Sequence, residues 1–225
     1  MISLKEISSI IKILKRETKR FENPLIEEIK EKNRDPFKIL ISCLLSLRTK
    51  DEIAAKASKK LFSLADNPKK MAILKEKEIM EAIKSVNYYK TKARRIKEIS
   101  IELIKNYGGK VPDNFEDLLK LKGVGRKTAN IVITNAFGKY GIAVDTHVHR
   151  ISNRLGIVKT KNPEETEYEL KRILPKRYWK DLNKIFVIWG QNICLPRNPK
   201  CDICKIKKYC EFFKNLKNIN KNPLI

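Results

Sequence analysis

The segment "LKGVGRKTANIVI", residues 121–133, decides the fold prediction for this chain. It places two glycines one residue apart, then a basic pair, then an apolar run with the three- and four-residue spacing of a helix. Glycine at these positions ends one helix and permits a tight turn. The sequence therefore predicts a turn at Gly123-Val124-Gly125 and a helix from about 126 to 137, closed by Gly138.

A second helix is predicted immediately before this turn. Asp113 is followed three residues later by Glu116, which is the pattern of a capping box that opens a helix running to Leu121. The two segments together predict a helix–turn–helix unit over about residues 113–138.

Helical spacing of apolar residues recurs along most of the 225 residues, whereas strict alternation over the length of a strand is hard to find. Helix starts are marked where a capping residue precedes proline. These starts are Asn23-Pro24, Asp35-Pro36, Asn67-Pro68 and Asn162-Pro163. The predicted fold class is all-α, with about ten helices.

The chain carries 50 Lys and Arg residues against 26 Asp and Glu residues, a formal net charge of +24. Such a charge favours a polyanionic partner such as nucleic acid, although a Lys-rich proteome would also explain it. No run of 18 apolar residues is present, and Lys5 and Glu6 interrupt the apolar residues at the N-terminus. We therefore expect an intracellular, cytoplasmic or nucleoid-associated protein that does not enter a membrane.

The turn at residues 123–125 has the composition of a phosphate-binding site. Gly123 and Gly125 permit positive φ and let an anion approach the backbone amides, and the N–H groups of the next helix start point outward. Arg126 and Lys127 add positive charge beside them. The alternative is a tight interhelical turn without a ligand. With the charge of the chain, the sequence favours DNA contact at Gly123, Val124, Gly125 and Arg126.

Lys127 and Asp145 are the candidate catalytic residues. Lys127 lies in the first turn of its helix, where the helix dipole and Arg126 disfavour a further cation, and a neutral amine can form a Schiff base. Asp145 precedes a short predicted helix in "AVDTHVHRISNRLG", which is closed by Gly156. It is either a simple N-cap or a carboxylate that assists departure of a base. We expect His147 and His149 to face DNA or to pack, rather than to bind metal.

Four of the five cysteines fall within residues 194–210 in the pattern C-x6-C-x2-C-x5-C, while Cys43 lies in an apolar stretch typical of a core. The pattern predicts a metal site at Cys194, Cys201, Cys204 and Cys210. Zinc usually uses two C-x2-C pairs, so a [4Fe–4S] cluster fits the irregular gaps better. We expect the basic tail after Cys210 to be frayed or solvated.

The segments "LKGVGRKTAN" and "AVDTHVHR" and the cysteine-rich ending together resemble the endonuclease III family of DNA glycosylases, over roughly residues 24–210. This resemblance implies a helix-hairpin-helix DNA glycosylase fold, with two helical lobes and a cleft between them. Residues 29–139 would form a six-helix lobe that carries the hairpin. Residues 1–28 and 140–225 would form a discontinuous lobe that holds the iron–sulfur cluster.

The resemblance also implies a reaction. Family members extrude a damaged base from the duplex, the lysine that matches Lys127 attacks the glycosidic carbon, and the aspartate that matches Asp145 assists. The Schiff base then permits β-elimination at the abasic site. We expect a monomeric, bifunctional DNA glycosylase and AP lyase of base excision repair, acting on duplex DNA that contains abasic sites or oxidised or ring-saturated pyrimidines such as thymine glycol.

Three positions depart from the family pattern. Lys122 stands in the hairpin where many bacterial family members have proline. In "CLLSLRTKDE", Arg48 stands where family members commonly have a glutamine that fills the gap left by the extruded base. In "VNYYKTKA", Tyr88 stands where an intercalating leucine is frequent, and its ring could stack on exposed bases or lie in the core. We expect Arg48, Tyr88 and His147 to contact DNA, and the departure at Arg48 leaves the opposite-base preference open.

Two other functions fit part of the pattern. A helix-hairpin-helix module could bind DNA without chemistry, and a redox-signalling protein could use the cluster itself as its functional centre. DNA binding would weaken with salt under each of these hypotheses. Chemistry at Lys127 therefore separates the enzyme from both.

Overall fold

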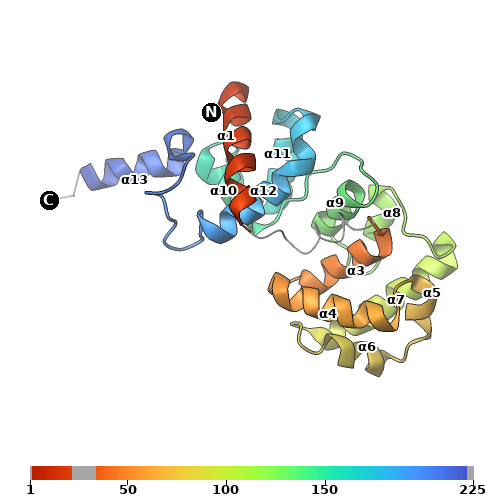
Figure 1. The fold of residues 1–225 in the computed structure, drawn as a ribbon. Coiled ribbons are helices and arrows are strands. Elements are labelled where there is room, and N and C mark those ends of the chain that lie inside the picture. The colour runs from red at the N-terminus through yellow and green to blue at the C-terminus, as the bar shows by residue number, and fades with distance from the viewer. Residues whose placement is uncertain (1, 22–33, 222–225) are drawn as a thin grey trace. The chain divides into compact units, whose positions relative to one another are not determined.

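The computed structural model describes residues 2–21 and 34–221, with side chains through residue 216. The described residues form twelve α-helices and three short 3₁₀ helices, without a β-strand (Figure 1). The prediction of an all-α fold is confirmed. The α-helices are α1 (Leu4–Glu17), α3 (Pro36–Ser46), α4 (Asp51–Leu64), α5 (Pro68–Ile73), α6 (Glu76–Ile83), α7 (Tyr89–Tyr107), α8 (Phe115–Lys120), α9 (Arg126–Asn135), α10 (Thr146–Leu155), α11 (Pro163–Ile173), α12 (Trp179–Asn192) and α13 (Glu211–Lys221). The 3₁₀ helices are η1 (Thr18–Arg20), η2 (Lys176–Tyr178) and η3 (Lys207–Tyr209).

Three of the four predicted helix starts are confirmed. Asp35, Asn67 and Asn162 are the N-caps of α3, α5 and α11, and each side chain accepts a hydrogen bond from a backbone N–H in the first turn. Proline follows each cap at the first helical position, where its missing N–H costs nothing. The predicted start at Asn23-Pro24 lies outside the described residues.

The chain divides into two compact units. One consists of residues 23–141 and the other of residues 1–22 and 142–225. The boundaries implied by the family resemblance are 28/29 and 139/140 instead. Within residues 34–141 the structure describes seven α-helices, α3 to α9, where the resemblance leads us to expect six in this lobe.

The unit of residues 23–141 is built around α3. This helix is apolar on nearly every side, and a helix of that kind is stable only when neighbours cover it all round. The helices α4, α7 and α9 pack against it. Cys43 on α3 is 2% exposed, so its predicted place in the core is confirmed.

The other unit joins the N-terminal helix to the last third of the chain. The residues Ile7, Ile10, Ile11 and Leu14 follow the i, i+3, i+4, i+7 spacing and bury one face of α1. This face belongs to one hydrophobic core with residues of α10, α11 and α12. Figure 1 shows α1 beside α12. The core therefore positions α10, which begins at Asp145.

The segment after Cys210 is helical as α13 through Lys221, which corrects the frayed alternative of the prediction, whereas Lys214 is exposed as the solvated alternative expects. Two aromatic residues in its first turn hold it. Phe212 lies under the Arg154 guanidinium, 4.6 Å from ring centroid to guanidinium carbon, and Phe213 lines the same cavity as the four cysteines. The prediction considered the lysines of the tail and overlooked this aromatic pair.

Candidate functional site

The predicted hairpin is present as α8, the hairpin turn at residues 121–125, and α9. Gly123 has φ +89°, and a Cβ on it would lie 2.8 Å from Cδ and Nη1 of Arg95. Gly125 has φ −95°, so the expectation of positive φ there is wrong. Gly125 is the N-cap of α9, a position with extended backbone, and a Cβ on it would meet no atom within 4 Å. The surface beside Gly125 is therefore open to an approaching anion.

Substitution of the two glycines separates stability from binding. Gly123→Ala is expected to cost about 1–2 kcal/mol, because alanine must adopt positive φ and displace Arg95. Gly125→Ala is expected to lose only about 0.5–1 kcal/mol, because alanine is a poorer N-cap than glycine but meets no steric clash. It is expected to weaken DNA binding several-fold, because the new methyl group occupies the anion approach. Thermal melts and fluorescence anisotropy on a duplex measure both effects. Unchanged DNA affinity in Gly125→Ala would remove the phosphate role of the turn.

The start of α8 differs from the predicted capping box. Asn114 is the N-cap and accepts from the Asp117 N–H at 2.9 Å, and α8 ends at Lys120. Asp113 instead pairs with Lys139, whose Nζ lies 2.6 Å from the Asp113 carboxylate. The same i, i+3 pattern occurs one residue later in the sequence, and an asparagine cap there is as good as an aspartate cap.

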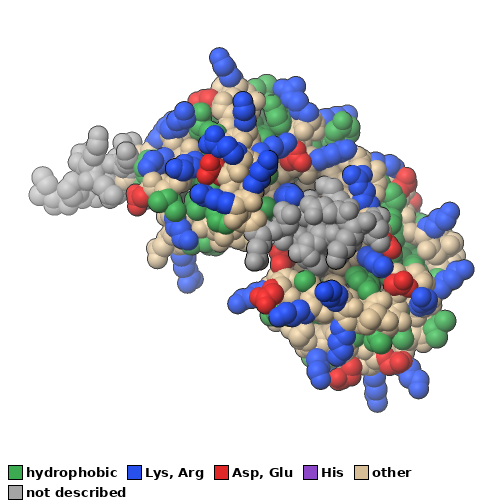
Figure 2. All heavy atoms as spheres, viewed as in Figure 1, with side chains coloured by type: hydrophobic (Ala, Val, Ile, Leu, Met, Phe, Trp, Pro, Cys, Tyr) green, Lys and Arg blue, Asp and Glu red, His purple; other side chains and the backbone are tan. Residues whose placement is uncertain are grey.

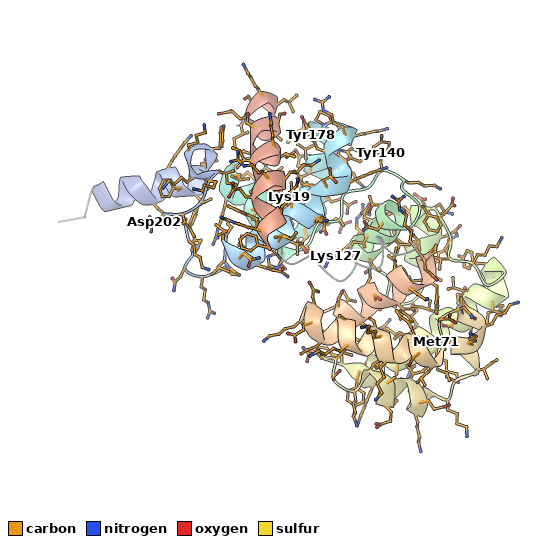
Figure 3. All side chains as sticks on the ribbon, in the orientation of Figure 1. Lys19, Met71, Lys127, Tyr140, Tyr178 and Asp202 are labelled. Carbon is orange, nitrogen blue, oxygen red and sulfur yellow. The ribbon has the colours of Figure 1, made fainter. Side chains whose placement is uncertain are left out.

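Lys127 is the second residue of α9 and is half-buried (Figure 3). α9 ends at Asn135, two residues before the predicted end at Phe137. Residues Thr128 to Thr134 are buried, so the helix is fixed against the core and Lys127 stands at its border. Arg126 places its guanidinium carbon 4.9 Å from the Phe115 ring centroid, which joins α9 to α8. Two cations thus mark the positive end of a rigid helix.

Asp145 is the N-cap of α10, and its Oδ1 accepts from the N–H groups of His147 and Val148, each at 2.9 Å. These two bonds fix the orientation of the carboxylate. α10 ends at Gly156, as predicted. A capping role is compatible with a role in catalysis. Because Oδ1 accepts both capping bonds, the position of the second carboxylate oxygen of Asp145 is fixed as well.

The two histidines have different surroundings. His147 is half-buried, and its Nδ1 lies 3.1 Å from Arg150 Nη2. His149 points into its own unit, where Nδ1 lies 2.7 Å from the Thr166 hydroxyl. The packing role that the sequence allowed is present at His149. DNA contact by His147 stays a prediction.

Arg48 and Tyr88 lie side by side on the surface of the unit of residues 23–141. Both have left-handed backbone, with φ of +54° and +58°, and both side chains are exposed. The Arg48 guanidinium carbon lies 5.9 Å from the Tyr88 ring centroid. Tyr88 is 63% exposed, so the alternative of a core tyrosine is wrong. Left-handed backbone in such residues costs about 1–3 kcal/mol each and needs support from the surroundings.

That support comes from Lys92, a residue that sequence analysis did not single out. Its Nζ donates to Leu45 O at 2.8 Å, to Leu47 O at 2.7 Å and to Thr49 Oγ1 at 3.1 Å. Asn87 donates its backbone N–H to Thr49 Oγ1 at 3.2 Å and its side-chain amide to the Arg48 carbonyl. We call Lys92, Thr49 and Asn87 the Lys92 network. It joins the turn that carries Arg48 to the turn that carries Tyr88.

The helical spacing of Lys92 with later apolar residues is a sequence signal that its side chain is buried. Lys92 is 7% exposed and shares the buried face of α7 with Ile96, Ile99 and Leu103. Burial lowers the pKa of its amine to about 8. Its three N–H donors meet three oxygen acceptors, which compensates much of the cost of burying the ammonium.

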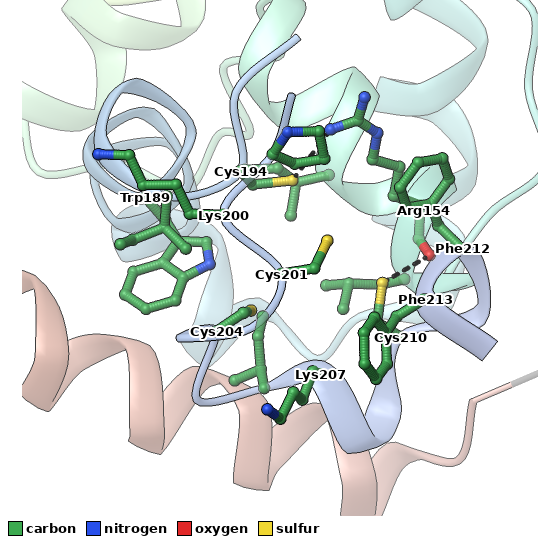
Figure 4. A pocket seen from close by; sticks show the side chains of 15 residues that line it. Arg154, Trp189, Cys194, Lys200, Cys201, Cys204, Lys207, Cys210, Phe212 and Phe213 are labelled. Atoms are coloured by element: carbon green, nitrogen blue, oxygen red, sulfur yellow. Dashed lines mark hydrogen bonds between the residues drawn. The ribbon is translucent and has the colours of Figure 1, made fainter. Parts of the chain in front are cut away.

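The four cysteines of the C-terminal pattern line one cavity (Figure 4). Arg154 of α10 connects two of them, because its Nη1 donates to Cys194 Sγ at 3.4 Å and its carbonyl accepts from Cys210 Sγ at 3.2 Å. The cavity contains about 410 Å³ of empty space, part of it open to solvent. Most of its other walls are apolar and include Ile151, Leu155, Trp189, Ile193, Ile206 and Phe213.

The donor set fits an iron–sulfur cluster better than a single zinc ion. A tetrahedral zinc ion with 2.3 Å bonds would bring four sulfurs to about 3.8 Å from one another. In the described part of the chain no three His, Cys, Asp or Glu side chains are arranged for a single ion. A [4Fe–4S] cluster takes one thiolate per iron and spreads the sulfurs around a larger body. Burial raises the pKa of Cys204 to about 11, so ligation requires the positive charge of the metal.

The positive charge of the chain does not by itself locate a binding surface. In the view of Figure 2, Lys and Arg side chains are spread over the visible surface of both units. The cations around the cysteine cavity follow this pattern, since Arg197, Lys200, Lys205 and Lys208 are exposed. None of the helices in the described ranges is long and apolar enough to cross a membrane.

Comparison with known proteins assigns the family. Residues 41–176 match the model of the "HhH-GPD superfamily base excision DNA repair protein", and residues 194–210 match the "Iron-sulfur binding domain of endonuclease III". Endonuclease III of Thermotoga maritima is 54% identical over 183 residues, which cover 81% of this chain and 86% of that protein. This chain belongs to the endonuclease III family.

Other members of the endonuclease III family agree in length and fold. Endonuclease III of Rickettsia conorii is 40% identical over 200 residues, covering 89% of this chain and 94% of that protein. The solved "Structure of a Trapped Endonuclease III-DNA Covalent Intermediate: Estranged-Adenine Complex" is 32% identical, covers 96% of this chain and 100% of that chain, and has a TM-score of 0.85. As a member of this family the chain is a base-excision DNA glycosylase and AP lyase with a [4Fe–4S] cluster.

Proposed function

We propose that this chain removes oxidised or ring-saturated pyrimidines, such as thymine glycol, from duplex DNA and then cleaves the strand through a Schiff base on Lys127. The place of Lys127 carries the proposal. It is the second residue of α9, next to a glycine N-cap whose surroundings are open. A helix start with these features can bind a phosphate, and the amine in its first turn is proposed to reach a sugar of the bound DNA strand.

The reaction follows from an amine at this place. The base must first leave the stack, since the glycosidic carbon is inaccessible inside it. The Lys127 amine attacks C1′, the bond from C1′ to the base breaks, and the base departs with the electron pair and gains a proton. The sugar ring opens to an iminium between C1′ and Nζ. Loss of a C2′ proton then expels the 3′ phosphate by β-elimination.

Asp145 is proposed to stabilise the positive charge that develops on the sugar as the base departs. Asp145→Asn keeps a good N-cap but removes the charge, so base release is expected to slow about a hundredfold with unchanged stability. Asp145→Ala is expected to lose about 1 kcal/mol of stability as well. Single-turnover base release and thermal melts measure the two effects. Wild-type base release by Asp145→Asn would leave Asp145 as a cap alone.

DNA binding is proposed to involve both units. The amides of Gly123, Val124 and Gly125, with Arg126, bind phosphate without reading sequence. Arg48, Tyr88 and His147 are proposed to contact the duplex at the damaged nucleotide. The logarithm of DNA affinity is expected to fall linearly with the logarithm of salt concentration, with a slope of about −0.9 per phosphate contacted. The support for duplex DNA as the partner comes from the endonuclease III–DNA complexes among the solved relatives.

Cys194, Cys201, Cys204 and Cys210 are proposed to hold the [4Fe–4S] cluster, one cysteine per iron. Their common cavity and its apolar walls support this assignment. The cluster would join residues 194–210 to α10 through Arg154 and keep the surrounding cations in place. We propose a structural role for it, in a monomeric protein that works inside the cell.

The test is base release and strand cleavage on a duplex with a single thymine glycol, beside the same duplex with thymine. Release of the damaged base followed by a strand break at that position is expected, with the undamaged duplex left intact. Binding of both duplexes without base release would identify a DNA-binding module instead. Base release without a strand break would identify a monofunctional glycosylase.

A further inference from the structure

Two neighbouring turns carry the residues proposed to enter the duplex. The turn of residues 47–49 follows α3 and carries Arg48, and the turn of residues 87–88 precedes α7 and carries Tyr88. Each has left-handed backbone at the residue whose side chain is exposed. A left-handed residue points its side chain in a direction that a helix or strand would not give it, so the backbone itself aims Arg48 and Tyr88.

The Lys92 network is the set of side chains that joins these turns. Lys92 donates to the Leu45 carbonyl at the end of α3. It also donates to the Leu47 carbonyl and to the Thr49 hydroxyl, which lie in the turn that carries Arg48. Asn87, directly before Tyr88, binds the Arg48 carbonyl and the same Thr49 hydroxyl. Thr49 Oγ1, in the turn that carries Arg48, is therefore the common acceptor of two donors from the Tyr88 side, the Asn87 N–H and the Lys92 amine. Rotation of either turn breaks bonds to the other.

We propose that Lys92, Thr49 and Asn87 are positioning residues that hold Arg48 and Tyr88 in one fixed pair, so that both side chains enter the duplex together when a nucleotide is extruded. This inference rests on the proposed function, because it needs Arg48 and Tyr88 to contact DNA. Neither Lys92 nor Thr49 needs to touch DNA. They reduce the conformational entropy that Arg48 and Tyr88 lose when the protein binds DNA.

A structural role for Lys92 alone makes a different prediction. Lys97 lies on the same helix and donates to the Leu74 carbonyl at 2.6 Å, so it is a matched lysine that bonds a carbonyl at the end of a helix. Among the described residues, Lys97 forms no hydrogen bond to the turns of Arg48 and Tyr88. If Lys92 acts through protein stability alone, Lys92→Met and Lys97→Met should each weaken DNA binding in proportion to the stability that the variant loses.

The experiment uses a duplex with a tetrahydrofuran abasic analogue and 2-aminopurine opposite it, whose fluorescence rises when a side chain unstacks it. The wild-type chain is expected to raise the fluorescence on binding. Lys92→Met is expected to abolish this rise and to weaken affinity for the analogue duplex about tenfold, the loss of one stacking contact, while affinity for undamaged duplex is unchanged. Lys97→Met is expected to behave as the wild-type chain does.

Two further variants keep the proposal falsifiable if Lys92→Met does not fold. Lys92→Arg keeps donors at this place and is expected to restore part of the fluorescence rise. Thr49→Val keeps the shape of the side chain, loses the shared acceptor, and is expected to lose most of the rise. A wild-type fluorescence rise in both Lys92→Met and Thr49→Val, or an equal loss in Lys97→Met, would overturn the proposal.

The proposed function is tested separately by base release from thymine glycol. A wild-type chain that releases the base but gives no fluorescence rise would overturn the pairing of Arg48 and Tyr88 and leave the proposed function standing. A chain that binds the analogue duplex with the expected rise, but releases no base, would overturn the proposed function and leave the Lys92 network standing.

Discussion

Lys127→Ala is expected to cleave a duplex with an abasic site at least about a thousandfold more slowly than the wild-type chain, because no Schiff base can form. Binding of the same duplex is expected to persist, since the backbone N–H groups of the hairpin turn and the side chain of Arg126 are unchanged. Alanine is a strong helix former, so α9 is retained. Strand cleavage on a gel and fluorescence anisotropy measure the two quantities on one preparation.

Lys122→Ala is the matched control, because Lys122 lies in the same hairpin, is exposed and pairs with Glu98 at 3.3 Å. Its removal is expected to weaken binding slightly and to leave the cleavage rate of the bound complex unchanged. Cleavage that persists in Lys127→Ala and falls in Lys122→Ala would assign the nucleophile to another amine.

In Cys204→Ser, the iron content of the purified protein is expected to fall to the background level. The brown colour and visible absorbance of an iron–sulfur cluster are expected to disappear with it. Hydroxyl oxygen is a poor ligand for iron in such clusters, where thiolates are the rule. DNA binding and cleavage are expected to fall sharply, because residues 194–210 lose the group that joins them to α10. Iron analysis, absorbance and circular dichroism follow cluster and fold together.

The fifth cysteine gives the control for this change. Cys43 is buried on α3 in the other unit, and burial raises its pKa to about 12, so it is neither exposed nor reactive. Cys43→Ala is expected to keep iron and absorbance and to lose only packing. A wild-type chain that contains zinc and no iron, with no visible colour, would contradict the cofactor assignment.

Helix ends that depend on interactions between residues close in sequence can be predicted from the sequence. The N-caps Asp35, Asn67 and Asn162 are correct, because the cap, the proline after it and the amide it binds lie within four residues. The C-cap at Gly156 is correct for the same reason. Asp113 shows the limit of such signals, since two neighbouring cap patterns compete and Asn114 prevails.

Tertiary contacts decide the features that the sequence did not predict. The Lys92 network joins residues 38 to 47 positions apart, and no local pattern records that pairing. The conformation of Gly125 follows from its place as the N-cap of α9, whereas the glycine itself is compatible with either sign of φ. The helix after Cys210 depends on Phe212 and Phe213 packing over residues that precede them by many positions.

The central claim is that Lys127 forms a covalent bond with C1′ of the damaged nucleotide. The most direct measurement is borohydride reduction of the chain bound to a thymine glycol duplex, followed by digestion and mass spectrometry of the cross-linked peptide. One adduct is expected, on the peptide that contains Lys127. An adduct on another lysine or on the N-terminal amine, or strand cleavage with no reducible adduct, would contradict it.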